Sequence, residues 1–102
     1  MFLPNNTDLT DKVAIVTGGT GVLGSVWVGA LAEAGAKVAI IGREKARLED
    51  QVKSLEAAGK KALGIQADVL DKASLKKAHE EILEGLGECD ILVNGAGGNH
   101  PI

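Results

Sequence analysis

Several residue types that point to particular functions are scarce in this sequence of 102 residues. It has one cysteine, Cys89, so no disulfide can form within the chain, and we expect a reducing compartment, the cytoplasm. Aromatic residues make up 2% of the chain, so the stacking platforms of single-strand nucleic-acid binders are lacking. The net charge is −3 without a basic block, which argues against a nucleic-acid partner.

Long apolar runs are also missing. The densest one, residues 26–32, ends at Glu33, whereas about twenty residues are needed to cross a bilayer. We therefore expect no membrane association. With 45% hydrophobic residues, 25% charged residues and only two prolines, the composition is typical of a folded domain. The length predicts a single domain over residues 1–102.

The sequence does have a regular alternation of short apolar runs and longer stretches of helical spacing. Four apolar runs predict strands at residues 13–17, 38–41, 62–65 and 91–93. Runs without polar alternation are typical of parallel strands covered on both faces. Apolar residues at helical spacing predict helices over residues 22–34, 44–58 and 72–86. Left-handed caps are expected at Gly35 and Gly59, and an N-cap is expected at Asp71.

This order of elements predicts a Rossmann-type α/β fold with a doubly wound parallel sheet. Strand–helix–strand units of this length require parallel pairing with right-handed crossovers. In an open sheet of this kind, ligands bind at the carboxyl ends of the strands. We therefore look for functional residues directly after each predicted strand.

Glycine is abundant, with 14 residues, and several fall in one turn after the first strand. Gly19, Gly21 and Gly24 have the G-x-G-x-x-G spacing of a dinucleotide-binding turn. Such glycines permit a tight turn, close approach of a pyrophosphate to the backbone, and close packing of the helix on the sheet. The alternative is a glycine-rich turn without a ligand. The residues predicted to bind the cofactor here are Gly18, Thr20, Gly21, Val22, Leu23 and Gly24.

The end of the second strand predicts which dinucleotide is bound. The ribose is usually recognised about twenty residues past the glycines, a place that Gly42 and Arg43 occupy. An acidic residue there would bind the 2′-hydroxyl of NAD, whereas a guanidinium matches a 2′-phosphate. Arg43 therefore favours NADP(H) over NAD(H). Two alternatives stay open: NAD(H) binding, or a solvated Arg43 that forms an ion pair with Glu44.

Taken together, these motifs resemble the N-terminal, cofactor-binding half of a short-chain dehydrogenase/reductase. The resemblance covers about residues 9–98 and rests on residues 12–19, the glycine turn, residues 31–36, residues 68–69 and residues 90–97. Residues 97–101 are most similar to a subgroup of sugar-acid reductases of the D-mannonate oxidoreductase or fructuronate reductase type. Gly21, Val22 and Gly95 depart from the common family pattern.

The resemblance implies roles for residues after the third and fourth strands. Asp68 and Val69 would contact the adenine, although Asp68 could instead be a turn or cap carboxylate. The turn after the fourth strand would lie under the adenine ribose, and it consists of Asn94, Gly95, Ala96 and Gly97. For Asn94, a structural hydrogen bond to a neighbouring strand is a compatible alternative.

The resemblance also implies the reaction, which is hydride transfer between a nicotinamide cofactor and an alcohol or ketone. The family's catalytic serine and Tyr-x-x-x-Lys pair lie downstream of this turn, and this chain has no tyrosine. We therefore expect a domain truncated before its catalytic half, with no catalytic residue and no activity of its own. The full-length protein is expected to be a homo-oligomer. The alternative is a non-catalytic sensor module of the same fold.

Three smaller expectations concern the strand order, a metal and Cys89. The resemblance implies the order 3-2-1-4, with the fourth strand left at the edge of the sheet in this chain. No metal site is expected, because His79 has no second ligand at suitable spacing. Cys89 is expected to be a small buried hydrophobic residue.

Overall fold

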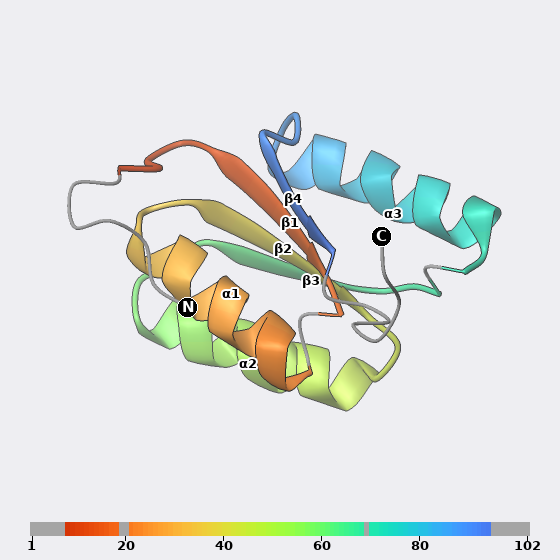
Figure 1. Ribbon diagram of the computed structural model, residues 1–102, viewed down its shortest axis with the longest axis horizontal. Helices are drawn as coiled ribbons and strands as arrows, with labels where there is room; N and C mark the ends of the chain where they lie inside the picture. Colours follow the sequence, from red (N-terminus) through yellow and green to blue (C-terminus); the bar gives the residue numbers. More distant parts are fainter. Residues whose placement is uncertain (1–7, 19–20, 69, 95–102) are drawn as a thin grey trace.

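The computed structural model describes residues 8–18, 21–68 and 70–94. Strands and helices alternate along the chain (Figure 1). In chain order they are β1 (Val13–Thr17), α1 (Val22–Glu33), β2 (Lys37–Gly42), α2 (Lys45–Ala57), β3 (Ala62–Gln66), α3 (Lys72–Gly85) and β4 (Ile91–Asn94). Each element begins and ends within one residue of the bounds that the sequence predicts.

The four strands form one parallel sheet in the order β3-β2-β1-β4. Figure 1 shows α1 and α2 on one face of this sheet and α3 on the other. The predicted α/β fold and strand order are thus confirmed. In register across the sheet, Ile15 of β1 lies beside Ala39 of β2 and Leu92 of β4.

The core consists of two apolar layers, one on each face of the sheet. Consecutive residues of a strand point to opposite faces, so Ala14 and Val16 enter one layer while Val13 and Ile15 enter the other. The layer under α1 and α2 also contains Val28, Leu31, Ala32, Ala36, Val38, Ile40 and Leu48. The layer under α3 also contains Ala39, Ile41, Ile65, Ala67, Ala78 and Ile82.

β4 is the edge strand that the sequence predicts, and unlike β1 it is not covered on both faces. All residues of β1 are buried, whereas Leu92 of β4 is 61% exposed. Leu92 is in register with Ile15 and therefore faces the α3 side of the sheet. Since β4 is an edge strand and α3 is the sole described helix on that side, the Leu92 side chain stays open to solvent.

The helix ends follow the predicted punctuation. Gly35 and Gly59 have φ values of +100° and +80°, the left-handed conformation expected of C-terminal caps. The Asp71 carboxylate accepts hydrogen bonds from the backbone N–H groups of Ala73 (3.0 Å) and Ser74 (3.4 Å), as an N-cap does. These caps fix where each helix begins or ends relative to the sheet.

The expectation of a buried Cys89 is wrong, since its side chain is exposed. Cys89 lies in the loop between α3 and β4, where Glu88 and Asp90 are also exposed. Its thiol donates to the Ile91 carbonyl oxygen (3.2 Å) instead of packing in the core.

No helix in the described ranges is long and apolar enough to cross a membrane.

Candidate functional site

The four strands are parallel, so their carboxyl ends lie along the same side of the sheet, where a fold of this kind binds its ligands (Figure 1). Hydrogen bonds link these ends directly. The Gly18 N–H donates to the Ile41 carbonyl oxygen (2.8 Å), and the Ala67 N–H donates to the Gly42 carbonyl oxygen (2.9 Å). The predicted site residues after β1, β2 and β3 are therefore held at one edge.

The turn after β1 begins at Gly18, whose φ is +70°. This left-handed conformation is one that glycine adopts without strain. The Gly18 carbonyl oxygen accepts a hydrogen bond from the Gly21 N–H (3.1 Å), which closes the turn ahead of α1. Thr20, together with Gly19, lies outside the described residues.

Gly21, the N-cap of α1, is not required by the fold itself. Its φ of −77° and ψ of 172° suit any residue, and a Cβ would lie 3.4 Å from the Gly18 carbonyl oxygen, an ordinary contact. No side chain of a described residue caps α1, so none of them satisfies the N–H groups of its first turn, which begins with Val22, Leu23 and the buried Gly24. An anion such as a pyrophosphate fits this position.

The N-termini of α3 and α1 differ in their capping: a side chain of a described residue caps α3 but none caps α1. Asp71 occupies the N-terminus of α3 with its carboxylate, whereas the smallest residue stands at the same position of α1. Ser25 does not act as the cap, because its hydroxyl and its N–H both donate to the Gly21 carbonyl oxygen (2.7 and 2.8 Å). The contrast leaves the N–H groups at the start of α1 available to an anion, although α2 has no side-chain cap either.

Arg43 directly follows β2, and its side chain is exposed. The alternative of a solvated Arg43 thus stays open, but its expected ion pair with Glu44 is wrong, because Glu44 pairs with Arg47 one helical turn away (3.2 Å). Among the described residues, no group pairs with the Arg43 guanidinium. A positive charge without a partner therefore lies at the carboxyl end of β2, where a ribose phosphate would bind.

Asp68, after β3, is a turn residue with spare acceptor capacity. One carboxylate oxygen accepts from the Leu70 N–H (2.9 Å), and the Asp68 N–H donates to the Ser74 hydroxyl (3.1 Å). The turn alternative is thus confirmed. The second carboxylate oxygen accepts no hydrogen bond from another described residue, so it remains open to an amino group such as that of adenine. Val69 lies outside the described residues.

Asn94 ends β4 and is bonded to the neighbouring strand. The Thr17 hydroxyl donates to the Asn94 side-chain oxygen (3.0 Å) and lies 3.4 Å from the Val93 carbonyl oxygen. The structural hydrogen bond foreseen for Asn94 is therefore present, and it ties β4 to the buried Thr17 of β1. Gly95, Ala96 and Gly97 lie outside the described residues.

Sequence reasoning did not single out Gln66, the last residue of β3. Its side-chain amide donates to the Arg43 carbonyl oxygen (3.0 Å). Finding Gln66 would have required the register of β3 against β2. In that register Gln66 pairs with Gly42, the residue before Arg43. Register of this kind is not readable from a single sequence.

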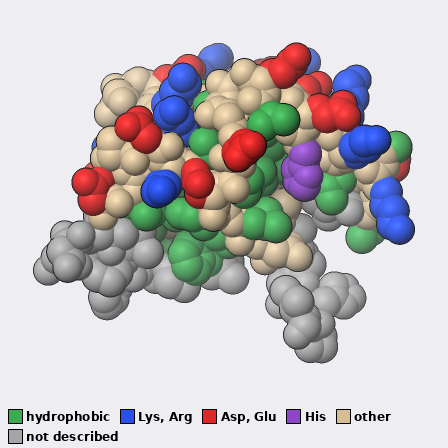
Figure 2. All heavy atoms as spheres, turned by 90° about the horizontal axis from the view of Figure 1, so that it is seen from above, with side chains coloured by type: hydrophobic (Ala, Val, Ile, Leu, Met, Phe, Trp, Pro, Cys, Tyr) green, Lys and Arg blue, Asp and Glu red, His purple; other side chains and the backbone are tan. Residues whose placement is uncertain are grey.

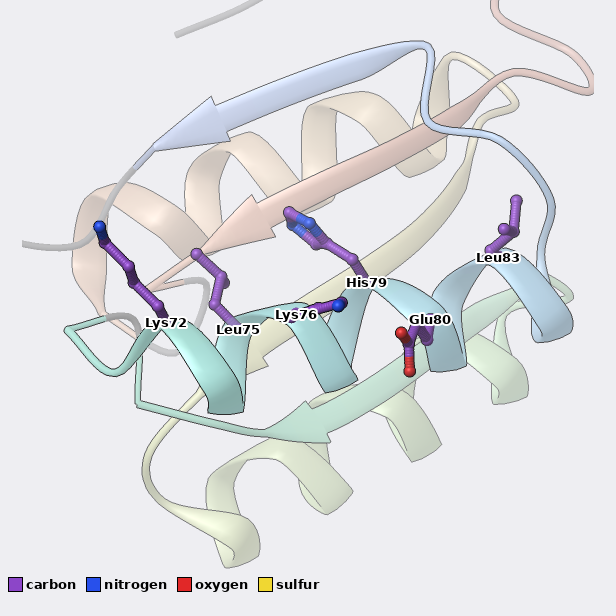
Figure 3. Close-up of a pocket in the computed structure, with 6 residues that line it drawn as sticks. All are labelled: Lys72, Leu75, Lys76, His79, Glu80 and Leu83. Carbon is purple, nitrogen blue, oxygen red and sulfur yellow. The ribbon is translucent and has the colours of Figure 1, made fainter.

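A hollow on the surface of α3 has a different character from the strand-end site. It is lined by Lys72, Leu75, Lys76, His79, Glu80 and Leu83. Figure 3 shows these side chains along α3, where Leu75 also packs against the core layer under this helix, and Figure 2 shows acidic and basic side chains interspersed on the surface seen from above. Within the described ranges, no cluster of His, Cys, Asp or Glu could hold a metal ion. The chemistry therefore concentrates at the strand ends.

The chain matches known proteins over nearly its whole length. The family model for short chain dehydrogenase matches residues 12–102. An uncharacterized oxidoreductase of Bacillus subtilis, UxuB, is 48% identical over 100 residues, which cover 98% of this chain and 36% of that protein.

Two solved structures with bound cofactors resemble the chain. One, described as a D-mannonate oxidoreductase from Haemophilus influenza with bound NAD, has a TM-score of 0.87 at 35% identity, covering 94% of this chain and 34% of the other. The second is a blue fluorescent protein from a metagenomic library in complex with NADPH, with a TM-score of 0.84 at 41% identity, covering 88% and 38%. The chain spans about a third of the length of the relatives it matches.

Proposed function

The chain belongs to the short-chain dehydrogenase family, and on that premise we propose that it is the cofactor-binding part of a longer oxidoreductase that prefers NADP(H). In that polypeptide, hydride would pass between the nicotinamide and an alcohol or ketone. The residues at the strand ends would bind and orient the dinucleotide. The groups that act on the substrate would come from residues beyond this chain, whose length is about a third of its relatives'.

The observation that carries this proposal is the uncapped N-terminus of α1 beside the turn at Gly18. Gly21 presents no side chain there, although a Cβ would meet no close contact. A Ser, Thr, Asp or Asn at this N-cap would stabilise the helix by only a few tenths of a kcal/mol more than glycine does, so folding alone places little constraint on the position. A pyrophosphate would satisfy the same N–H groups and gain from the helix dipole.

Arg43 supports the preference for NADP(H). Its guanidinium has no partner among the described residues, because Glu44 is engaged by Arg47. A 2′-phosphate would supply two oxygen acceptors in the geometry that a guanidinium matches. Structural relatives contain NAD in one case and NADPH in another, so the choice depends on residues such as Arg43.

The substrate class that we propose is a sugar acid or its keto form. The support is the likeness to the protein described as a D-mannonate oxidoreductase, at 35% identity over nearly the whole chain. Residues beyond this chain would form the substrate pocket and the contacts of a homo-oligomer. The cofactor part would supply the dinucleotide to that pocket.

The test of the cofactor assignment is Arg43→Ala in the full polypeptide, with NADPH and NADH titrated by their fluorescence. Loss of a charge-assisted contact should weaken NADPH binding by about 1.5–3 kcal/mol and leave NADH nearly unchanged. Arg47→Ala is the matched control, since it removes an exposed guanidinium that already has a partner. An equal loss for both cofactors would contradict the role of Arg43.

A further inference from the structure

Two successive carbonyl groups after β2 are bound by the end of β3. The Gly42 carbonyl oxygen accepts from the Ala67 N–H (2.9 Å), and the Arg43 carbonyl oxygen accepts from the Gln66 side-chain amide (3.0 Å). The first bond belongs to the main-chain pairing of the two strands. The second continues that pairing by one residue through a side chain, beyond the point where the strands end.

The position of the backbone between Arg43 and α2 depends on this second bond. Glu44 has an extended conformation (φ −101°, ψ 102°), and its side chain does not cap α2 because it pairs with Arg47. No other described residue binds the Arg43 carbonyl oxygen. The link between β2 and α2 is thus held at Arg43 by Gln66 from the neighbouring strand.

We propose that Gln66 is a positioning residue that sets cofactor specificity, because it fixes the backbone from which Arg43 reaches the ribose 2′-phosphate. This inference rests on the proposed preference for NADP(H). A guanidinium that must form two parallel bonds to a phosphate loses affinity when its own backbone is free to move, since that freedom is lost on binding. Gln66 removes the freedom before the ligand arrives.

The chemistry of Gln66 explains why a neutral donor is suited to this role. A glutamate of the same length could not donate to the Arg43 carbonyl, and its charge would oppose a phosphate nearby. An apolar residue of the same length would fill the space without the bond. Gln66→Met therefore removes the hydrogen bond while it retains the length of the side chain, on a residue that is exposed.

The experiment measures the affinity of the full polypeptide for two fragments by calorimetry, 2′,5′-ADP and 5′-AMP. The two probes share the adenosine and the 5′-phosphate, and differ in the 2′-phosphate. Gln66→Met should weaken 2′,5′-ADP binding roughly three- to tenfold, the value of one hydrogen bond, and change 5′-AMP binding less than about twofold. Lys61→Met, at the opposite end of β3, is the control and should change neither.

Arg43→Ala and the double variant separate this inference from the proposed function. Arg43→Ala should weaken 2′,5′-ADP binding more than Gln66→Met does, and adding Gln66→Met to it should have no further effect. If Arg43→Ala weakens 2′,5′-ADP and Gln66→Met does not, the role of Gln66 is overturned while the function stands. An equal loss of both probes in Gln66→Met also overturns it. If Arg43→Ala has no effect, the preference for NADP(H) and the role of Gln66 both fall.

Discussion

One carboxylate at the amino end of the sheet is engaged by hydrogen bonds within the chain, whereas several polar groups at the carboxyl end have no partner among the described residues. Asp90 illustrates the first case. Its carboxylate accepts from the Val13 N–H (2.9 Å), and its own N–H donates to the Val13 carbonyl oxygen (2.8 Å). The Asp90 carboxylate and the Asp90 N–H both have partners within the fold, so a structural role is sufficient to explain this residue.

The carboxyl end shows the second case. Among the described residues, no side chain caps the first turn of α1, none pairs with the Arg43 guanidinium, and none donates to the second Asp68 carboxylate oxygen. The fold gains nothing from leaving these groups unpaired. We therefore expect Asp90 and the turns at the amino end to serve stability and the polar groups at the carboxyl end to serve binding, so substitutions at the two ends should affect different measurements.

The largest expected effect is that of Gly21→Asp, at the carboxyl end. The new carboxylate would lie where the pyrophosphate binds, and two like charges about 4 Å apart repel by about 4 kcal/mol near a protein surface, which predicts more than about 100-fold weaker NADPH binding. The same carboxylate would cap α1, so the free energy of unfolding should rise by a few tenths of a kcal/mol. Titration of NADPH fluorescence and urea unfolding measure the two effects.

Gly29→Asp is the control for this substitution. Gly29 is an exposed glycine of α1 with nothing within 4 Å of an added Cβ, and it lies away from the helix start. The same carboxylate there should leave NADPH affinity within about twofold, because repulsion between exposed charges is screened over a Debye length of about 8–10 Å. Loss of stability together with loss of binding in Gly21→Asp would show that Gly21 serves the fold.

The opposite pattern is expected at the amino end, for Gly35→Ala. Gly35 has φ +100°, and a Cβ would lie 3.0 Å from the Thr10 hydroxyl oxygen and 3.3–3.4 Å from its backbone. Strain and contact together should lower the free energy of unfolding by about 2–3 kcal/mol, with cofactor affinity per folded molecule unchanged.

Gly59→Ala measures the cost of backbone strain alone, without the close contact with Thr10 that an alanine at position 35 would also make. Gly59 also has a positive φ, +80°, but nothing lies within 4 Å of an added Cβ. This variant should cost about 1 kcal/mol, the lower end of the strain range. If the two alanine variants are equally unstable in urea unfolding, the close approach of Thr10 to Gly35 contributes nothing.

The sequence was sufficient for features that depend on local pattern. Apolar runs and helical spacing located every element within one residue, and Gly35, Gly59 and Asp71 marked the helix ends. These signals are local because a helix or strand buries its apolar side chains at a fixed period. The same reasoning placed Gly21 and Arg43 at strand ends.

The features that the sequence did not predict depend on neighbours that are distant along the chain or on the exact start of a helix. The Gln66 bond to Arg43 requires the register of β3 against β2. The exposure of Cys89 depends on which elements cover it, not on how apolar it is. Glu44 pairs with Arg47 because the start of α2 brings residues three apart to one side of the helix.

The smallest expected effect is a pH dependence at the amino end, from Asp8. The Thr10 hydroxyl (2.6 Å) and the Thr10 N–H (3.0 Å) both donate to one Asp8 carboxylate oxygen, which lowers the pKa of Asp8 below its ordinary value of 3.8. Because the folded pKa is the lower one, the stabilisation is complete above the ordinary pKa and is lost as the pH falls through the folded pKa. Asp8 is exposed, so the effect is small.

Asp8→Asn tests this, since the amide oxygen can still accept from Thr10 but carries no charge to titrate. Thermal unfolding of both proteins from about pH 6 to about pH 2 should show the wild type slightly more stable above about pH 4, with the difference vanishing at the acid end. Cofactor affinity at neutral pH should be the same in both, as expected for the amino end of the sheet. A difference in stability that persists unchanged at about pH 2 would mean that packing of the Asp8 side chain, and not its charge, holds this turn.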